Sequence, residues 1–239
     1  LKAMADGDGR YFLNLVEALS ILPAEPALDA AALARVVQQR APAYDKDREG
    51  HYNLISALHK SLRGSDTDAA LYWMARMLEG GEDPAYICRR LTRFAVEDIG
   101  LADPNAAVQA LAAWDIYERL GSPEGELAIA QLVVYLGTAP KSNATYTAYK
   151  AARKSAKETG SLMPPMHILN APTKMMKELG YSAGYQYDHD TAEGFSGQNY
   201  FPDGMNRRRF YDPPERGFER EVRKRLEYWD RLRAKKHGD

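Results

Sequence analysis

Hydrophobic residues recur at helical spacing along most of the chain. Leu54, Ile55, Leu58 and Leu62 form one stripe in which apolar side chains return every three or four positions. That period places them on one side of an α-helix, where they can pack against a neighbour. Similar stripes occur within residues 12–19, 33–37, 71–78 and 218–232. The pattern therefore predicts an all-α protein.

Proline and glycine mark the boundaries of the central helices. Three expected helix starts pair an oxygen-bearing side chain with a proline: Asp83–Pro84, Asp103–Pro104 and Ser122–Pro123. The side-chain oxygen can accept a hydrogen bond from the first turn, and proline loses nothing at a position whose N–H has no helical partner. The expected ends of the three helices are Gly100, Gly121 and Gly137. Short connections of this kind favour antiparallel neighbours, which predicts a compact helical bundle over residues 46–160.

The C-terminal part has a different character. After expected helices at 142–158 and 173–179, residues 181–211 are rich in Gly, Tyr and Asn and show no helical stripe. This composition predicts an ordered aromatic loop, with room for a small hairpin. A long C-terminal helix follows, with Glu219 and Arg223 four residues apart on its solvent side. Together with a polar seam near residues 42–47, these changes divide the chain into residues 1–45, 46–160 and 161–239.

The net charge and the distribution of apolar residues disfavour two functional classes: proteins that coat nucleic acid and proteins that span a membrane. The 239 residues carry a net charge of −1, with 45% hydrophobic and 27% charged residues. A near-neutral chain does not coat nucleic acid by bulk charge, so any such contact needs a local basic face. No apolar run approaches the roughly 20 residues that cross a bilayer, and the first residues do not resemble a signal peptide. We therefore expect a cytoplasmic protein that makes no membrane contact.

The sequence lacks the common signatures of an active site. A phosphate-binding loop needs a Gly-Lys pair, and none occurs, which predicts that the chain alone does not hydrolyse ATP. His51 and His59 are two helical turns apart, which disfavours a shared metal ion. The single cysteine, Cys88, excludes an internal disulfide and a cysteine-based zinc site. We expect no catalytic residue, no metal and no cofactor in this chain.

Three residues could have either a reactive role or a purely structural one. Cys88 has two arginine neighbours that could lower its pKa, but a buried structural thiol is the favoured interpretation. Ser142 could be a nucleophile activated by Lys141, but a helix N-cap explains it without catalysis. His189, between two aspartates, could be an oriented imidazole, although an exposed loop histidine is favoured.

Two basic groups are candidates for contact with nucleic acid. The first group surrounds one expected helix and comprises Lys141, Lys150, Arg153, Lys154 and Lys157. The second group is followed by Phe210 and Tyr211 and comprises Arg207, Arg208 and Arg209. Phosphates attract such cations, and unpaired bases stack on such rings. The alternative, which stays open, is that both groups are solvated surface charge.

Several longer runs carry a family resemblance. They are Gly7–Arg10, His51–Ser65, Phe94–Pro104, Ala139–Asn143 and Asn170–Lys174. Together they resemble the replication-associated recombination ATPases, called RarA or MgsA in bacteria, which are similar to clamp loaders. The resemblance covers nearly the whole chain.

The resemblance implies an architecture and a nucleotide-sensing residue. It places the end of an AAA+ lid in the first residues and the family's C-terminal domain, similar to a clamp-loader collar, after it. The ATP-binding core, with its ATP and Mg²⁺, is then expected upstream of this chain. Arg10 matches the lid arginine that senses nucleotide in the intact ATPase, a task suited to a guanidinium that can bind phosphate oxygens in pairs. Tyr11 departs from the family, in which a second arginine is usual at that position.

The resemblance also implies partners. Members of the family are DNA-dependent ATPases that act at stalled replication forks and associate with single-stranded-DNA-binding protein, and their C-terminal domains hold four subunits together. We therefore expect a nucleoid-associated homotetramer in which this chain provides self-association and partner docking. The alternative is that it binds single-stranded or forked DNA directly.

Overall fold

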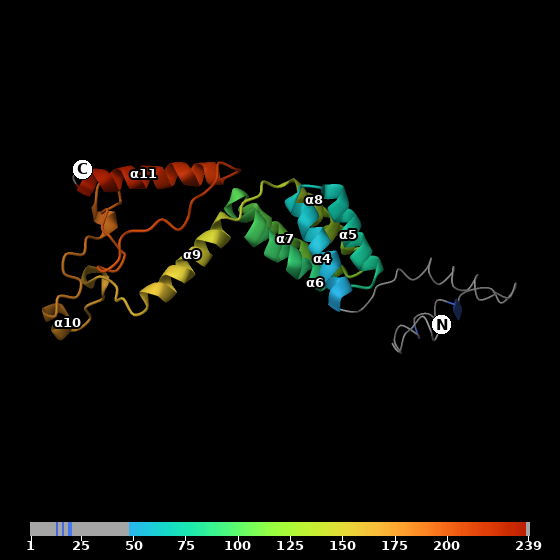
Figure 1. Ribbon diagram of the computed structural model, residues 1–239, viewed down its shortest axis with the longest axis horizontal. Helices are drawn as coiled ribbons and strands as arrows, with labels where there is room; N and C mark the ends of the chain where they lie inside the picture. Colours follow the sequence, from blue (N-terminus) through green and yellow to red (C-terminus); the bar gives the residue numbers. More distant parts are fainter. Residues whose placement is uncertain (1–12, 14–15, 17–18, 21–47, 238–239) are drawn as a thin grey trace. The chain divides into compact units, whose positions relative to one another are not determined.

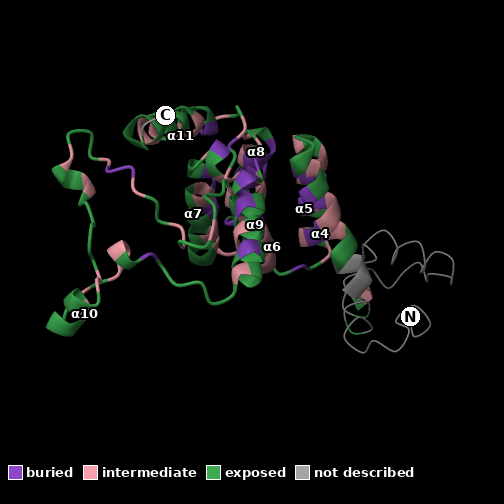
Figure 2. Ribbon diagram, turned by 60° about the vertical axis from the view of Figure 1, so that its left-hand side comes forward, coloured by how far each residue is buried: buried purple, intermediate pink, exposed green. Residues whose placement is uncertain are grey.

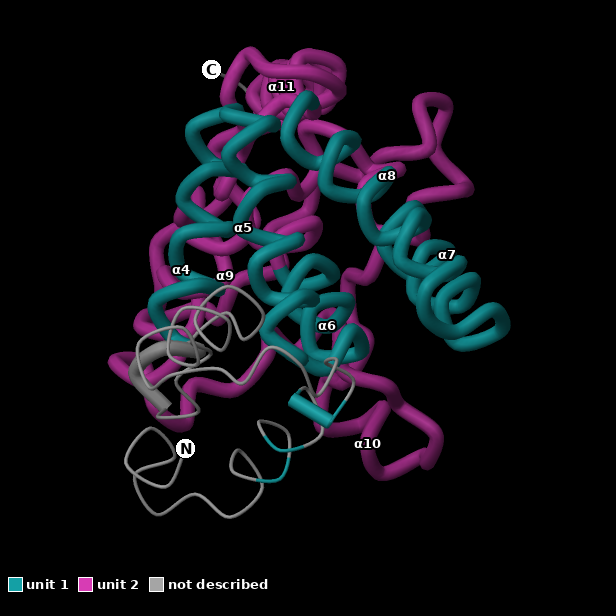
Figure 3. The backbone as a smooth tube through the Cα atoms, turned by 90° about the vertical axis from the view of Figure 1, so that its right-hand side faces the viewer, with its two compact units in different colours: residues 1–93, 109–138 teal, residues 94–108, 139–239 magenta. Residues whose placement is uncertain are grey.

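The computed structural model describes residues 13, 16, 19–20 and 48–237 (Figure 1). Arg10 and the helix expected near residues 33–37 lie outside these residues. The described residues form helices and irregular segments and no strand, which confirms the all-α prediction. The chain divides into two compact units, residues 1–93 with 109–138 and residues 94–108 with 139–239 (Figure 3). The boundary near residue 160 stays a prediction.

The first unit is a bundle built around three packed helices. Leu58, Leu62, Met77 and Leu136 have no exposed surface, and they come from the three helices that contact one another, α4, α5 and α8. The buried positions mark the inward-facing sides of α4 and α5 in Figure 2. The helices of the central region are α4 (Arg48–Arg63), α5 (Thr67–Glu79), α6 (Pro84–Phe94), α7 (Asn105–Leu120) and α8 (Glu126–Thr138).

Side-chain caps begin α5, α6 and α7, and those at Asp83 and Asp103 are the ones that the sequence predicts. The Asp66 carboxylate accepts a hydrogen bond from the N–H of Ala69 at 3.0 Å. Asp83 does the same for Ala85 at 2.9 Å, and Asp103 accepts from Asn105 at 3.0 Å. Each bond satisfies a donor that the helix leaves without a backbone partner.

The predicted start of α8 at Ser122–Pro123 is wrong. The helix begins at Glu126, after a turn in which the N–H of Gly125 bonds to the carbonyl of Gly121 at 2.6 Å. The Ser122 hydroxyl lies 3.3 Å from the Tyr117 hydroxyl instead of capping α8, and the Ser122–Pro123 peptide is cis. The Ser122 side chain, which local rules assign to the cap of α8, therefore contacts Tyr117 of α7 instead.

The helix α8 ends one residue after the end expected at Gly137, and the glycine has a role other than stopping the helix. Gly137 is buried inside α8, which continues to Thr138. A Cβ atom added to Gly137 would lie 2.6 Å from the Thr67 Oγ1 atom of α5. The glycine therefore permits a close approach of two helices rather than a turn.

Cys88 is confirmed as a buried structural thiol. It has no exposed surface, and burial, with a smaller effect from Asp83 and Glu118, raises the pKa of its thiol to about 11. The neighbouring arginines therefore do not activate it. Because the thiolate is the reactive form, we expect a maleimide to label folded protein at pH 8 more than about 100-fold slower than protein in urea. Labelling of the folded chain at the rate of a free thiol, followed by mass spectrometry, would contradict this placement.

His59 couples the stability of the first unit to pH. Its side chain is buried, and burial, with the charges of Arg90 and Arg63, lowers the pKa of its imidazole to about 4. The unfolded chain, with an ordinary histidine pKa near 6.5, therefore binds a proton more readily than the folded chain between pH 6.5 and pH 4. This contribution to stability is complete above about pH 6.5 and is lost as the pH falls towards 4.

We expect the free energy of unfolding to fall by about 2 kcal/mol between pH 7 and pH 5 because of His59. Urea titrations of the wild type and of His59→Gln at both pH values check this. His59→Gln should lose most of the pH dependence, whereas His189→Gln, which changes an exposed loop histidine, should keep it. Equal pH dependence in all three proteins would contradict the assignment to His59.

The second unit joins two long helices through a short helical segment. Asp98 and Ala102 provide carbonyl groups that accept the N–H groups of Ser142 and Phe218, both at 2.8 Å. These bonds fix the chain before α9 and before α11. The elements of this unit besides the start of α7 are η1 (Ala95–Ile99), η2 (Gly100–Ala102), α9 (Ala144–Thr159), η3 (Met166–Ile168), α10 (Lys174–Glu178), η4 (Asp188–Asp190) and α11 (Glu219–His237).

The aromatic segment is an ordered loop, as predicted, and the small hairpin for which its composition left room does not form. Its centre is the Asp188 carboxylate, which accepts hydrogen bonds from the N–H of Ser196 at 2.7 Å and from the Tyr200 hydroxyl at 3.0 Å. These bonds lower the pKa of Asp188. Side chains thus replace the strand ladder that a hairpin would need. The Phe195 ring, 5.0 Å from Trp229, packs this loop on α11.

The predicted pairing of Glu219 with Arg223 is wrong. Glu219 is fully buried, and its carboxylate accepts a hydrogen bond from the Tyr211 hydroxyl at 2.7 Å. Burial and this bond raise the pKa of Tyr211 far above its usual range. Arg223 instead donates to the carbonyl of Pro213 at 2.8 Å and lies 3.4 Å from Asp212. The first turn of α11 is therefore held by the preceding loop.

Candidate interaction surfaces

Two of the candidate site residues have structural roles at the start of α9. The Ser142 hydroxyl is buried and accepts the N–H of Ala144 at 3.2 Å, so it caps the helix from a position just before the N-cap. The Lys141 ammonium donates to the carbonyl of Ala139 at 2.6 Å, and partial burial lowers its pKa. Arg216 in turn donates to the carbonyl of Lys141 at 3.2 Å. Lys141 therefore belongs to the junction of the second unit.

The other four residues of the first basic group lie along α9. Lys150, Arg153, Lys154 and Lys157 are spaced by three, four and seven residues, which places them on one face of the helix, and all four are exposed. The Arg153 guanidinium lies 5.7 Å from the centre of the Tyr149 ring. We call these four residues the α9 basic face.

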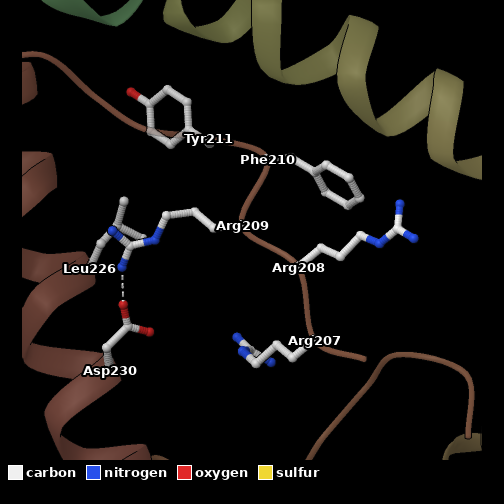
Figure 4. Close-up of a pocket in the computed structure, with 7 residues that line it drawn as sticks. All are labelled: Arg207, Arg208, Arg209, Phe210, Tyr211, Leu226 and Asp230. Atoms are coloured by element: carbon white, nitrogen blue, oxygen red, sulfur yellow. Dashed lines mark hydrogen bonds and ion pairs between the residues drawn. The ribbon is translucent and has the colours of Figure 1, made fainter. Parts of the chain in front are cut away.

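Arg208 links the second basic group to α9. Its Nη1 atom donates to the buried hydroxyl of Ser155 at 3.2 Å and lies 3.8 Å from the Glu158 carboxylate. The two groups that the sequence presents 50 residues apart therefore meet within the second unit. Figure 4 shows Arg208 directed away from the side chains of Arg209 and Asp230.

Arg207 and Arg209 border a hollow of about 350 Å³ between their own segment and α11. Arg209 forms an ion pair with Asp230 of α11 (Figure 4). Arg207 lies with its guanidinium 5.7 Å from the centre of the Phe201 ring. The remaining lining residues are Arg208, Phe210, Tyr211 and Leu226. We call this feature the arginine hollow.

In the first unit, α7 and α8 present an exposed apolar face. Ile116 and Leu120 of α7 are 43% and 57% exposed, and Leu127 and Val134 of α8 are 75% and 41% exposed. A shallow groove of about 50 Å³ runs between the two helices, lined by these small or uncharged residues: Gln109, Ala112, Ala113, Ile116, Ala128, Gln131 and Leu132. We call these surfaces together the α7–α8 face.

No charged residue is among those that form the α7–α8 face. Its polar members are Gln109 and Gln131, whose amides can both donate and accept hydrogen bonds. Asp115 and Arg119 lie beside the face on α7, each one residue before an exposed apolar side chain, and form a two-bond ion pair at 3.0 and 3.2 Å. This face is not predictable from the sequence, because the helical period of apolar residues on α7 and α8 does not show which side of a helix meets a neighbour.

The second unit exposes a separate surface of methionine and leucine. Met163 and Met175 are 70% and 65% exposed, and Leu162, Met166 and Leu179 are 44%, 42% and 59% exposed. They lie on and around η3 and α10, between proline-rich turns. We call this the methionine surface. Flexible, polarizable side chains of this kind suit contacts that adapt to a partner.

The described residues show neither a membrane span nor a metal centre. None of their helices is long and apolar enough to cross a bilayer. Nor do three or more of their His, Cys, Asp and Glu side chains gather where a metal ion could be held.

Comparisons with known proteins identify first the class and then the family. Residues 1–63 match a family model described as an AAA C-terminal domain, which assigns the chain to the C-terminal regions of AAA+ ATPases. Residues 64–230 match the model described as the C terminal of the MgsA AAA+ ATPase. The chain therefore belongs to the MgsA AAA+ ATPase family, which confirms the resemblance.

Relatives in three bacteria are named replication-associated recombination protein A. The chain is 49% identical to the protein of Coxiella burnetii over 233 residues, which are 95% of this chain and 53% of that protein. It is 46% identical to the Haemophilus influenzae protein, covering 95% and 52% of the two chains, and 45% identical to the Escherichia coli protein, covering 93% and 51%. The chain spans about half the length of the curated relatives it matches.

Proposed function

We propose that this chain is the self-association and partner-docking region of a DNA-dependent AAA+ ATPase that acts in replication-fork maintenance and recombination. The observation that carries the proposal is the α7–α8 face, where four large apolar side chains of the two helices are 41% to 75% exposed and one of them, Ile116, lines a groove. Contiguous apolar surface of this kind commonly marks an interface. The names of the relatives support the role in replication and recombination.

A second copy of the chain is the occupant that best suits the α7–α8 face. Glutamine amides complement other glutamine amides, and an uncharged face does not repel its own copy. In a four-fold arrangement the same face of all four copies can meet around one axis, and Asp115 of one copy can then approach Arg119 of the next. The number of four subunits rests on the family resemblance.

The methionine surface is the proposed docking site for other proteins. Its side chains lie on short helices and turns, which can adapt to a partner more readily than the long helices α7 and α8. The resemblance points to single-stranded-DNA-binding protein as one such partner. ATP, Mg²⁺ and the nucleotide-sensing role of Arg10 belong in this proposal to the intact ATPase, and the chain alone is not a catalyst.

The test of self-association is the solution mass of the chain, measured by light scattering at micromolar concentration over a range of salt. We expect a species of four subunits without nucleotide or DNA. Moderate salt should not dissociate it, because burial of apolar surface does not depend on weak ionic contacts. A mass of one subunit that stays constant over a tenfold rise in concentration would overturn the proposal.

Direct contact with nucleic acid is the second candidate function. The observation in its favour is the meeting of the α9 basic face with the segment of Arg207, Arg208 and Arg209 through the Arg208–Ser155 bond. This concentrates positive charge locally in a chain whose net charge is −1. The affinity of the chain for a single strand should fall steeply with salt, since phosphate contacts release counter-ions.

A further inference from the structure

The arginine hollow contains more positive charge than its acidic residue can neutralise. Arg209 and Arg233 both pair with Asp230, Arg233 at 3.2 Å from a carboxylate oxygen. Among the residues that the structure shows lining the hollow, Asp230 alone is acidic. Burial, with a smaller effect from the charge of Arg207, lowers the pKa of Arg233. Two guanidinium groups, those of Arg209 and Arg233, therefore share one carboxylate, while that of Arg207 lies against the Phe201 ring.

The guanidinium groups are also incompletely hydrogen-bonded. The Nε–H of Arg233 is buried and finds no acceptor among the described residues. The Arg233 side chain is only 17% exposed, and its guanidinium lies 5.0 Å from the centre of the Phe195 ring, so water has little access to it. Buried donors of this kind normally have a partner. Arg233 does not itself line the hollow, but its ion pair with Asp230 takes up part of the charge of the one acidic lining residue.

The size and the lining residues of the hollow indicate which kind of anion it can bind. A volume of about 350 Å³ is at the lower end of small-ligand sites, enough for one nucleotide unit and too small for a duplex. Guanidinium groups bind phosphate oxygens in pairs, and aromatic rings accept unpaired bases. Phe210 and Tyr211 line the hollow, and Phe201 lies beside Arg207 with its ring 6.2 Å from that of Phe210. Cations and rings are thus adjacent, as in sites for single strands.

We propose that the arginine hollow binds a backbone phosphate of single-stranded nucleic acid between Arg207 and Arg209, with Asp230 as the anion that competes for this position. The inference rests on the second proposed function and specifies its site. Asp230 holds Arg209 in place when the hollow is empty of ligand and weakens phosphate binding by its charge. The α9 basic face, reached through Arg208, continues the path of the strand.

The experiment is a fluorescence anisotropy titration of a labelled 15-nucleotide thymidine strand with the full chain at low salt. We expect Arg207→Ala and Arg209→Ala each to weaken binding about tenfold and to reduce the salt slope by roughly 0.7, the share of one phosphate contact. Arg220→Ala is the matched control, because Arg220 is exposed and about 15 Å along α11 from Asp230. It should weaken binding less than about twofold.

The direction in which Asp230→Asn changes the affinity for the strand is the decisive test of the hollow. If the carboxylate competes with phosphate, its removal should tighten binding of the strand about three- to tenfold, an effect that partial unfolding cannot produce. Glu215→Gln, the same loss of charge in an exposed loop, should change affinity much less. Inorganic phosphate should compete with the strand on the wild type and not on Arg207→Ala.

The outcomes separate this inference from the function on which it rests. A wild type that does not bind the strand at low salt would overturn nucleic-acid contact, and the hollow with it. Binding that Arg207→Ala weakens no more than Arg220→Ala, or that Asp230→Asn weakens, would overturn the hollow alone. Polyglutamate that displaces the strand at equal charge concentration, in an Arg207-dependent way, would assign the hollow to an acidic peptide instead.

Discussion

Replacing Leu120 and Leu127 together by glutamate is expected to leave the chain as a single subunit at concentrations where the wild type is assembled. Both side chains are mostly exposed in the isolated subunit, so the substitutions should change its free energy of unfolding by less than about 1 kcal/mol. In an interface, the same glutamates would bury two charges per copy without partners. The dissociation constant should rise at least about 100-fold, as measured by sedimentation velocity.

The matched control is the pair Met175→Glu and Leu179→Glu on the methionine surface. These residues are 65% and 59% exposed, so the change in charge and in apolar area is similar. The control variant should keep the mass of the wild type. If the control dissociates and the Leu120 and Leu127 variant does not, the methionine surface is the self-association interface and the α7–α8 face is free.

Gly217→Ala is expected to destabilise the second unit by at least about 3 kcal/mol. A Cβ atom on Gly217 would lie 2.0 Å from the carbonyl oxygen of Ala102 and 2.8 Å from Pro140. The Ala102 carbonyl cannot move freely, because it also accepts the N–H of Phe218 and thereby anchors the start of α11. The substitution should therefore release this junction, seen as a lower melting temperature and faster chymotrypsin cleavage near α11.

Gly194→Ala separates backbone conformation from steric contact. Gly194 has a φ of +61°, close to the +48° of Gly217, but nothing lies within 4 Å of its Cβ position. Its replacement should cost only the preference of glycine for a left-handed conformation, about 1 kcal/mol. Equal losses in the two variants would show that the contact with Ala102 contributes nothing.

Local rules predicted the helices well where the signal was itself local. The predicted caps at Asp83 and Asp103 depend on residues two positions away, and both form. Gly137 and Glu219 were misassigned because their roles depend on distant partners. Gly137 meets Thr67 of another helix, and Glu219 is buried by a loop that returns to it.

In the candidate surfaces too, features set by local sequence were predictable and features set by distant partners were not. Helical period alone places Lys150, Arg153, Lys154 and Lys157 on one face of α9, and the structure does so. Lys141 is adjacent to that helix in sequence, but its ammonium group donates a hydrogen bond to the carbonyl of Ala139 before the helix. The arginine hollow could not be predicted, because Asp230 is 21 residues from Arg209 and reaches it only through the fold of the aromatic loop against α11.

The central claim, that a second copy covers the α7–α8 face, is tested most directly by hydroxyl-radical footprinting with mass spectrometry. The wild type is compared with the Leu120→Glu, Leu127→Glu variant, which is expected to have the mass of one subunit, at equal concentration. We expect oxidation of Ile116 and Val134 to be several-fold lower in the wild type, because these side chains are 43% and 41% exposed in the single subunit and buried in the assembly. Met175, on the methionine surface, should be oxidised equally in both. Equal oxidation of Ile116 and Val134 in the two proteins would contradict the account.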